Sequence, residues 1–563
     1  MKAKILLKSW HLVFFMGVLF VFNSCAKDGD FQEAERSSED MCIQIKVKGF
    51  VDAQDVQIGK PALRASADGR AVPSKNSQLI GLGDNSFAEV SFGNQFQKNR
   101  LRLLAQNGVN SLVSAGNDVA VFPMETGTKY IVLVFDENDT HQSTTLVTLG
   151  AQDMIRIPKP ANLETGSLTR SYRFVAFSYN TKSETDFQEV LASLQPDQSN
   201  NQPQVRIPLD KQFLYCNVQH DLDFSANKLV NQPSDPISFV LHEQRSKVGV
   251  IIDGKSMFSK VKKVEGQFEG LLTHTATMDL KGNAITDRVE DNSQSMQFSY
   301  KDRSQDTLAI YRYTVAPSPN MTVTDFRINL TSLELSRESI QKVLVTSSSP
   351  RTFLFAPFEM DQGVQSVARV HLFEGFQVGA GANAKLWSLA NLYHDPTATD
   401  GQSFKIRANA FDGMRLSTDY FRFNRLNPIS IDDQLRSNNT GDPCSQVYPL
   451  GTWRLPTNAD INNFISASGS YSMTVYDAKD GDELGNRYDY IQYENNGQSI
   501  RFYTLGRREA GLFSYEGIRA EFWTSDDRIL RFLSLVSGGE TYASNSPSVG
   551  SGLALNIRCV RDR

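Results

Sequence analysis

The sequence of 563 residues lacks the features that mark several classes of protein. Beyond its N-terminal segment it has no apolar run of about 20 residues, so no later segment is expected to cross a membrane. The net charge of −5 gives no basic surface for nucleic acid. The seven histidines are scattered, and no two cysteines have CxxC spacing. We therefore expect no metal ion, no cofactor and no nucleic-acid partner.

Catalytic motifs are also missing. The chain has no Gly-x-Ser-x-Gly, no His-Glu-x-x-His and no P-loop. Adjacent acidic residues such as Asp526 and Asp527 point in different directions on a strand or loop, so they do not form the facing carboxylate pair of a glycosidase. The sequence therefore predicts a protein that is not an enzyme.

What the sequence does contain begins with an export signal. Three lysines precede a short apolar run, Leu12–Phe22, which ends just before Cys25. This run is too short for a membrane span and is typical of a bacterial secretory signal. We predict a lipoprotein signal peptide over 1–24, with Cys25 carrying the acyl chains, such as palmitate, that anchor the precursor. The alternative is an ordinary signal peptide with a chance cysteine.

Residues 25–39 are polar and acidic, and we interpret them as a tether between the lipid and the folded chain. This stretch also resembles the acidic segment that sends lipoproteins of Bacteroides-group bacteria to the cell surface. The predicted location is therefore the cell outer membrane, with the lipoprotein exposed at the surface.

Four cysteines remain after Cys25, an even number that favours disulfides in an exported protein. Cys444 and Cys559 are the better pair, because they bracket what reads as one domain. A bridge that closes so long a loop could contribute up to about 4–5 kcal/mol in the chain-entropy model. Cys42 and Cys216 are a weaker second pair, and buried free thiols are the alternative.

Most of the chain reads as β-strand. Residues 41–48 alternate apolar and polar side chains, as a half-buried strand does. Residues 130–135 and 172–179 are apolar runs that end at turn residues. Further strands are expected at 239–241, 248–252, 307–314 and 343–346, and short helices at 185–194 and 458–465, the second capped by Thr457. The recurring turns favour β-sandwiches.

The length of the chain suggests several domains. We divide the part after the tether into 40–215, 216–378 and 379–563. Residues 379–383, made of glycine, alanine and asparagine, read as a linker before the third domain.

Two stretches of the expected first domain share one pattern. In 127–136 a glycine leads into Tyr130 and an apolar strand, and in 166–178 a glycine precedes Tyr172 and a second such strand. The pattern resembles the fimbrillin family, the pilus subunits of Bacteroides-type bacteria, in which a glycine turn leads into a tyrosine-containing strand. The resemblance implies a mostly β chain with two fimbrillin-like (transthyretin-like) β-sandwich domains.

The last third of the chain contains a suggestive series of short segments. They are 387–393, 420–423, 442–449, 451–457, 522–525 and 557–562. Their order looks like the C-terminal module of some fimbrillin-like surface proteins. This similarity implies a smaller α+β module of C-type-lectin-like character after the two sandwiches.

The aromatic residues of this third domain have two interpretations. Trp453, Trp523 and the two cysteines are expected to hold the fold, because a tryptophan suits a core with a polar edge. If they are exposed, Trp523, Tyr488 and Tyr490 could instead stack on the apolar faces of sugar rings. These three are the candidate ligand-binding residues.

The fimbrillin resemblance also implies assembly by strand exchange. In that family a protease cuts after an arginine, an N-terminal strand is lost, and a strand from another subunit fills the groove by β-augmentation. Residues 41–51 are the strand that would be lost here. The polar stretch 57–75 follows as an accessible loop, and it holds two candidate cleavage sites, Arg64 and Arg70. Arg64 is slightly favoured, and a merely exposed arginine is the alternative.

Only four residues follow Cys559, so little tail is left to donate to a further subunit. We therefore predict an adhesive accessory subunit at the tip of a surface fimbrium. Its expected partners are other fimbrial subunits, the lipid of the outer membrane in the precursor, and a host or bacterial receptor or glycan. The alternatives are an anchoring subunit and a surface glycan-binding lipoprotein, which would keep residues 25–64.

Overall fold

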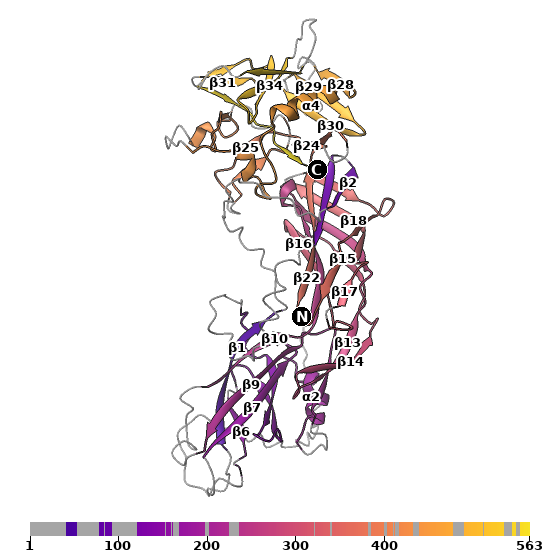
Figure 1. Ribbon diagram of the computed structural model, residues 1–563, viewed down its shortest axis with the longest axis vertical. Helices are drawn as coiled ribbons and strands as arrows, with labels where there is room; N and C mark the ends of the chain where they lie inside the picture. Colours follow the sequence, from indigo (N-terminus) through magenta and orange to yellow (C-terminus); the bar gives the residue numbers. More distant parts are fainter. Residues whose placement is uncertain are drawn as a thin grey trace, which may run out of the picture.

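The protein is elongated and mostly β in its computed structural model, with three bodies along the long axis (Figure 1). The expected fold class of β-sandwiches is confirmed, and the lectin-like character of the third body stays a prediction. The structure describes residues 41–52, 78–83, 85–92, 121–151, 154–158, 160, 168–196, 202–224, 236–319, 321–337, 340–380, 384–398, 402–408, 410, 416–431, 439–476, 489–509, 512–533, 543–547 and 552–562.

The first body is built on a seven-stranded sheet in the order β5-β4-β7-β9-β10-β1-β6. Its strands are β1 (Met41–Val51), β4 (Lys129–Phe135), β5 (His141–Thr148), β6 (Met154–Ile157), β7 (Thr169–Ser178), β9 (Leu214–Asp223) and β10 (Ile237–Glu243). The neighbours pair antiparallel with one exception, since β1 runs parallel to β10. The expected strands at 41–48, 130–135, 172–179 and 239–241 are all present.

Both faces of this sheet are covered, which explains why 130–135 reads as an unbroken apolar run. Alternate residues of β4 pack in two separate hydrophobic cores, one on each face of the sheet. Tyr130 is the first of them on one face, and Ile131 is the first on the other. The second core is closed by Phe187 of α2 (Thr185–Ser193) and by a small sheet. This sheet contains β8 (Gln204–Ile207), β13 (His274–Asp279) and β14 (Ala284–Glu290). A strand buried on both faces has no polar side, so its period-2 alternation is lost.

The second body consists of two sheets that share one hydrophobic core. The first sheet has β2 (Gln78–Gly83), β3 (Ser86–Phe92), β11 (Ser246–Asp253), β16 (Thr307–Thr314) and β22 (Gln365–Glu374), in the order β16-β11-β22-β3-β2. The second has β12 (Lys260–Glu269), β15 (Gln297–Tyr300), β18 (Arg327–Arg337), β19 (Ile340–Val345) and β20 (Arg351–Leu354). A turn η3 (Lys255–Met257) and the pair β17 (Met321–Val323) and β21 (Phe358–Met360) complete it.

The sheets do not divide at the expected domain boundaries. The boundary at 215/216 falls inside β9, and both β9 and β10 belong to the first sheet. In the opposite sense, the β2–β3 hairpin comes from the expected first domain but pairs with β22 of the second body, and in Figure 1 this indigo hairpin lies among later strands. The strand at 376–378 belongs to the third body. A linear division of the sequence misses these crossings because sheet partners are set by long-range pairing.

The third body is a set of small sheets with one α-helix and one short 3-10 helix among its described residues. Its strands are β23 (Phe376–Val378), β24 (Lys385–Trp387), β25 (Leu392–His394), β26 (Phe404–Ile406), β27 (Phe421–Arg422), β28 (Ser472–Tyr476), β29 (Tyr490–Asn495), β30 (Gln498–Tyr503), β31 (Arg507–Glu509), β32 (Leu512–Ser514), β33 (Arg519–Trp523), β34 (Arg528–Leu533), β35 (Ala543–Pro547), β36 (Leu553–Leu555) and β37 (Val560–Asp562). The helical parts are η5 (Pro443–Gln446) and α4 (Asn458–Ser468). We call residues 376–562 the C-terminal module. Because β37 pairs with β24, the two ends of the module are joined.

Both expected helices are present. The first agrees closely with 185–194, and the second extends three residues beyond 465. Thr457 caps α4 as predicted, since its hydroxyl accepts a hydrogen bond from the N–H of Asp460, while the Asp460 carboxylate accepts one from the N–H of Thr457. Among the described residues, no helix is long and apolar enough to cross a membrane.

Candidate functional site

The strand β1 holds two parts of the first body together. Its first four residues pair antiparallel with β6, from Met41 opposite Ile157 to Gln44 opposite Met154. The rest pairs parallel with β10, from Ile45 opposite Ile237 to Val51 opposite His242. The strand therefore lies inside the sheet, although the next described strand, β2, belongs to the second body.

The neighbouring strand β10 depends on β1 for most of its sheet pairing. Only His242 and Glu243, at its end, pair with β9 on the other side. The stretch from Ile237 to His242 pairs with β1. Without β1, β6 and β10 would present unpaired backbone edges, which invite the addition of another strand.

The side chains of β1 complete a hydrophobic core. Ile43 and Ile45 are buried among residues of β6 and β10, while Gln44 and Lys46, which alternate with them along the strand, are exposed. The core residues of the two neighbours are Ile155, Ile157, Ile237, Phe239 and Leu241, all of them buried. Loss of β1 would thus open an apolar groove along this body. Every second side chain of the first part of β1 is apolar and fits into that groove. We call the space filled by β1 the β1 groove.

A glycine in β1 lets a distant segment come close. Gly49 has a φ of +141°, and a Cβ on it would lie 2.3 Å from the carbonyl oxygen of Phe122. Phe50, the next residue, exchanges two backbone hydrogen bonds with Phe122. A side chain at position 49 would displace this contact, so the close approach requires glycine.

Several predicted site residues cannot be placed. Cys25, the cleavage candidates Arg64 and Arg70, and the aromatic candidate Tyr488 lie outside the described residues. The described chain stops at Asp52 and resumes at Gln78, so both arginines fall between β1 and the β2–β3 hairpin.

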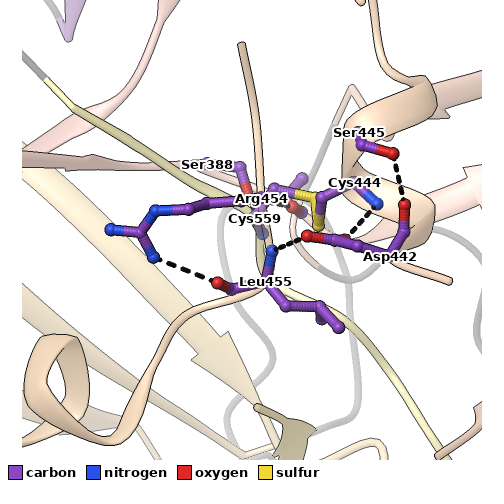
Figure 2. The surroundings of a disulfide bond; sticks show 8 residues. Ser388, Asp442, Cys444, Ser445, Arg454, Leu455 and Cys559 are labelled. Atoms are coloured by element: carbon purple, nitrogen blue, oxygen red, sulfur yellow. Dashed lines mark hydrogen bonds between the residues drawn. A yellow bond between two sulfur atoms is a disulfide. The ribbon is translucent and has the colours of Figure 1, made fainter. Parts of the chain in front are cut away.

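The predicted disulfide between Cys444 and Cys559 is confirmed, and it lies in the core of the C-terminal module (Figure 2). It joins η5 to the residue before β37. The carboxylate of Asp442 accepts hydrogen bonds from the N–H groups of Cys444 and Leu455, at 2.9 and 2.8 Å. Burial raises the pKa of Asp442 in spite of these hydrogen bonds.

The second cysteine pair considered from the sequence is not formed. Cys216 is a free, buried thiol, so it does not pair with Cys42. Burial raises its pKa to about 12. Such a thiol is inert and acts as a small apolar group in the core.

Two of the three candidate ligand-binding aromatics are in the wrong place for a ligand. Trp523 is 1% exposed and donates its indole N–H to the carbonyl of Phe421 at 2.6 Å. Tyr490 is 3% exposed and stacks on Tyr476 at a centroid distance of 4.4 Å. Both rings are packed inside the module and are not accessible to a sugar, so the prediction that they bind one is wrong. The expected structural role of Trp523, like that of the buried Trp453, is confirmed.

The C-terminal module is docked on the β2–β3 hairpin. Arg561 of β37 contacts Glu89 of β3 at 2.6 Å, and both side chains are largely buried. At the tip of the hairpin, the amide of Asn85 exchanges two hydrogen bonds with the backbone of Ser499. The sequence reading missed this role of the hairpin, and neither residue carries a local signal for it.

A second contact joins the module to strand β11 of the same sheet. The hydroxyl of Tyr448 donates to Asp253 of β11 at 2.7 Å, and His371 of β22 lies 3.3 Å from the same carboxylate. Burial alone raises the pKa of Asp253, but the interactions with His371 and Tyr448 outweigh it and hold the pKa below the usual value. Asp253 is therefore ionised at neutral pH and binds the two bodies together.

A pocket between the first sheet and its covering elements does not indicate a ligand. It has a volume of about 380 Å³ and lies beside α2 and β8. Four of its charged side chains are already paired, Lys211 with Asp186 at 2.6 Å and Arg206 with Asp291 at 3.4 Å. Within the described ranges, no group of three His, Cys, Asp or Glu side chains could hold a metal ion.

No protein-family model and no curated protein matches the chain. Its neighbours among solved structures include fimbrial and cell-adhesion proteins, the class that the sequence resemblance predicts. A proposed cell adhesion protein from Bacteroides fragilis is 10% identical with a TM-score of 0.28, over 61% of this chain and 95% of that one.

Two further neighbours are named as parts of fimbriae. A fimbrial assembly protein from Parabacteroides distasonis has 12% identity and a TM-score of 0.22, over 46% of this chain and 86% of that chain. The fimbrial anchor protein Mfa2 from Porphyromonas gingivalis has 14% identity and a TM-score of 0.21, over 39% and 73%. These TM-scores are too low to carry a functional argument, so the function must come from the geometry of the chain itself.

Proposed function

We propose that this chain is an adhesive accessory subunit of a surface fimbrium, made as a lipoprotein precursor and assembled by strand exchange. Cleavage in the segment between β1 and β2 releases β1, and a strand from another subunit enters the β1 groove. The protein acts by binding and by structure rather than by catalysis. The C-terminal module supplies the adhesive surface.

The position of β1 is the observation that carries this proposal. It lies within a sheet, it supplies most of the pairing of β10, and it fills an apolar core. Removal of a strand in this position costs free energy, because it exposes both backbone edges and buried side chains. The next described strands in the chain, β2 and β3, nevertheless belong to another body, so a cut between β1 and β2 would free β1 without cutting the sheet.

The C-terminal module supports a place for the subunit at the tip of the fimbrium. Residues 560–562 pair with β24, and Arg561 is fixed on β3, so these residues are engaged in the chain's own fold. They are not available as a donor strand. A subunit that accepts a strand and presents a module at the far end of the molecule fits the tip. An anchoring subunit is the runner-up.

The test is the N-terminal sequence of the protein isolated from native surface fibres. The proposal expects a start at Ala65 or Ala71, after cleavage at Arg64 or Arg70. The double variant Arg64→Ala, Arg70→Ala should keep the precursor N-terminus and stay out of the fibres. Arg206→Ala is the matched control, since that exposed arginine lies outside the loop.

The two outcomes separate the roles. A start in the loop supports a strand-accepting tip or stalk subunit. A lipidated Cys25 start, with 25–64 intact in the fibre-bound protein, contradicts the tip role and leaves an anchor or a glycan-binding lipoprotein.

A further inference from the structure

The groove that β1 fills has a charged end. Asp52 is the first residue after β1, and its carboxylate lies 3.1 Å from the ammonium group of Lys247 in β11. The Lys247 side chain is 9% exposed and that of Asp52 is 22% exposed. The ion pair thus joins the strand of the first body to the second body through a mostly buried contact.

The ammonium group of Lys247 is held in place by aromatic rings. It lies 4.3 Å from the ring centre of Tyr311 and 5.9 Å from that of Tyr313, both on the neighbouring strand β16. Gly249 makes room for one of them, because a Cβ at that position would lie 2.3 Å from the Tyr311 ring. The rings attract the cation but do not neutralise its charge.

A second cation in the same region has its own carboxylate. The guanidinium of Arg245 forms two hydrogen bonds of 2.9 Å with Glu243, which lies two residues away in the same segment. This pair would survive the loss of β1. Among the described residues, Lys247 has one ion-pair partner, Asp52, and this partner would leave with β1.

A largely buried ammonium group left without its carboxylate costs free energy. A strand that enters the β1 groove therefore binds best when it restores this charge. The position is set by the register, since Val51 pairs with His242 and places the next residue beside Lys247. Three residues before the acid, Gly49 is required by the close approach of Phe122.

We propose that Lys247 is a selectivity residue of the β1 groove, which accepts a partner strand with an aspartate or glutamate directly after its last buried apolar residue, the position of Val51. This inference rests on the proposed function. The partner is an extended strand of another subunit, with apolar residues at the positions of Ile43, Ile45 and Val51, glycine at position 49 and the acid at position 52.

The experiment measures how short strands bind to the cleaved chain. The purified mature protein is cut by limited digestion with an arginine-specific protease, and the released segment is removed in mild denaturant. Fluorescent peptides covering residues 41–54 are then titrated by anisotropy. Three peptides are compared, with the native sequence, with Asp52→Asn and with Lys46→Gln, which changes an exposed charge on the same strand.

The expected result is a loss of affinity that depends on Lys247. Asp52→Asn should weaken binding to the native protein on the order of tenfold, as for loss of a hydrogen bond between charged groups. Lys46→Gln should change it by less than about twofold, as expected for an exposed charge. Against a Lys247→Met protein, the native and Asp52→Asn peptides should bind equally, and a Lys247→Arg protein should still prefer the native peptide.

The failures of the two proposals are distinguishable. If the native and Asp52→Asn peptides bind the native protein equally well, the selectivity of Lys247 is wrong while strand exchange stands. If the native peptide does not bind the cleaved protein, the proposed strand-accepting function is itself wrong. The peptide series on the native protein gives this answer even if the Lys247→Met chain does not fold.

Discussion

Single residues hold the C-terminal module through contacts that are far apart in the sequence. The Cys444–Cys559 bond spans 115 residues and is buried beside Trp453. The hydroxyl of Ser388 accepts a hydrogen bond from the N–H of Cys559 at 3.0 Å, which fixes the same point from another segment. The disulfide joins η5 to the start of β37, and the Ser388 hydrogen bond joins the same point to the segment after β24.

We predict that reduction of this disulfide destabilises the module. A loop of this length gives roughly 4–5 kcal/mol in the chain-entropy model. Urea unfolding followed by tryptophan fluorescence checks the prediction, because Trp387, Trp453 and Trp523 all lie in the module. Reductant should lower the midpoint of this transition.

Two cysteine variants provide the controls for this measurement. The double variant Cys444→Ser, Cys559→Ser should unfold at the lower midpoint with or without reductant. Cys216→Ala removes a free thiol from a different body and should keep the full response to reductant. A midpoint that does not move on reduction of the native protein would contradict the prediction.

At the scale of elements, the sequence predicts what depends on local pattern. The strand at 307–314 has the observed bounds, and the alternation of 41–48 marks β1. Thr457 followed by Asp460 is a local signal for the start of α4, and it is correct. Such features need only neighbours in the chain.

The parts that the sequence could not predict depend on distant partners. Nothing within residues 78–92 shows that this hairpin pairs with β22 of the second body. Burial of Trp523 is set by packing against Phe421, and the partner of Lys247 is 195 residues away. An exposed aromatic and a buried one, or a free lysine and a paired one, look the same in the sequence.

We predict that the cap of α4 can be tested by a small change. Thr457→Ala removes the hydroxyl that accepts from Asp460 N–H, and it should destabilise the module by about 1 kcal/mol. Thr457→Ser keeps the hydroxyl and should stay close to the native value. The same tryptophan-detected urea unfolding gives the comparison. Equal losses for both variants would show that the methyl group, not the cap, is responsible.

At the scale of the whole molecule, two neighbouring stretches of the chain have different attachments. β1 pairs with β6 and β10 of the first body and exchanges two further backbone hydrogen bonds with Phe122. The β2–β3 hairpin, which follows it in the chain, pairs with β22 and carries the contacts of Glu89 and Asn85 to the C-terminal module. The segment that contains the predicted cleavage sites connects these two attachments.

This arrangement predicts a localised response to cleavage, which hydrogen–deuterium exchange can measure. After cleavage between β1 and β2 and removal of the freed segment, amides of β6 and β10 should exchange faster, because they lose their sheet partner. Amides of β3 and β22 should keep their exchange rates, since their pairing and the Glu89–Arg561 contact do not involve β1. The uncut Arg64→Ala, Arg70→Ala protein supplies the reference. Faster exchange in β3 would contradict the separate attachment of the hairpin, and unchanged exchange in β10 would contradict its dependence on β1.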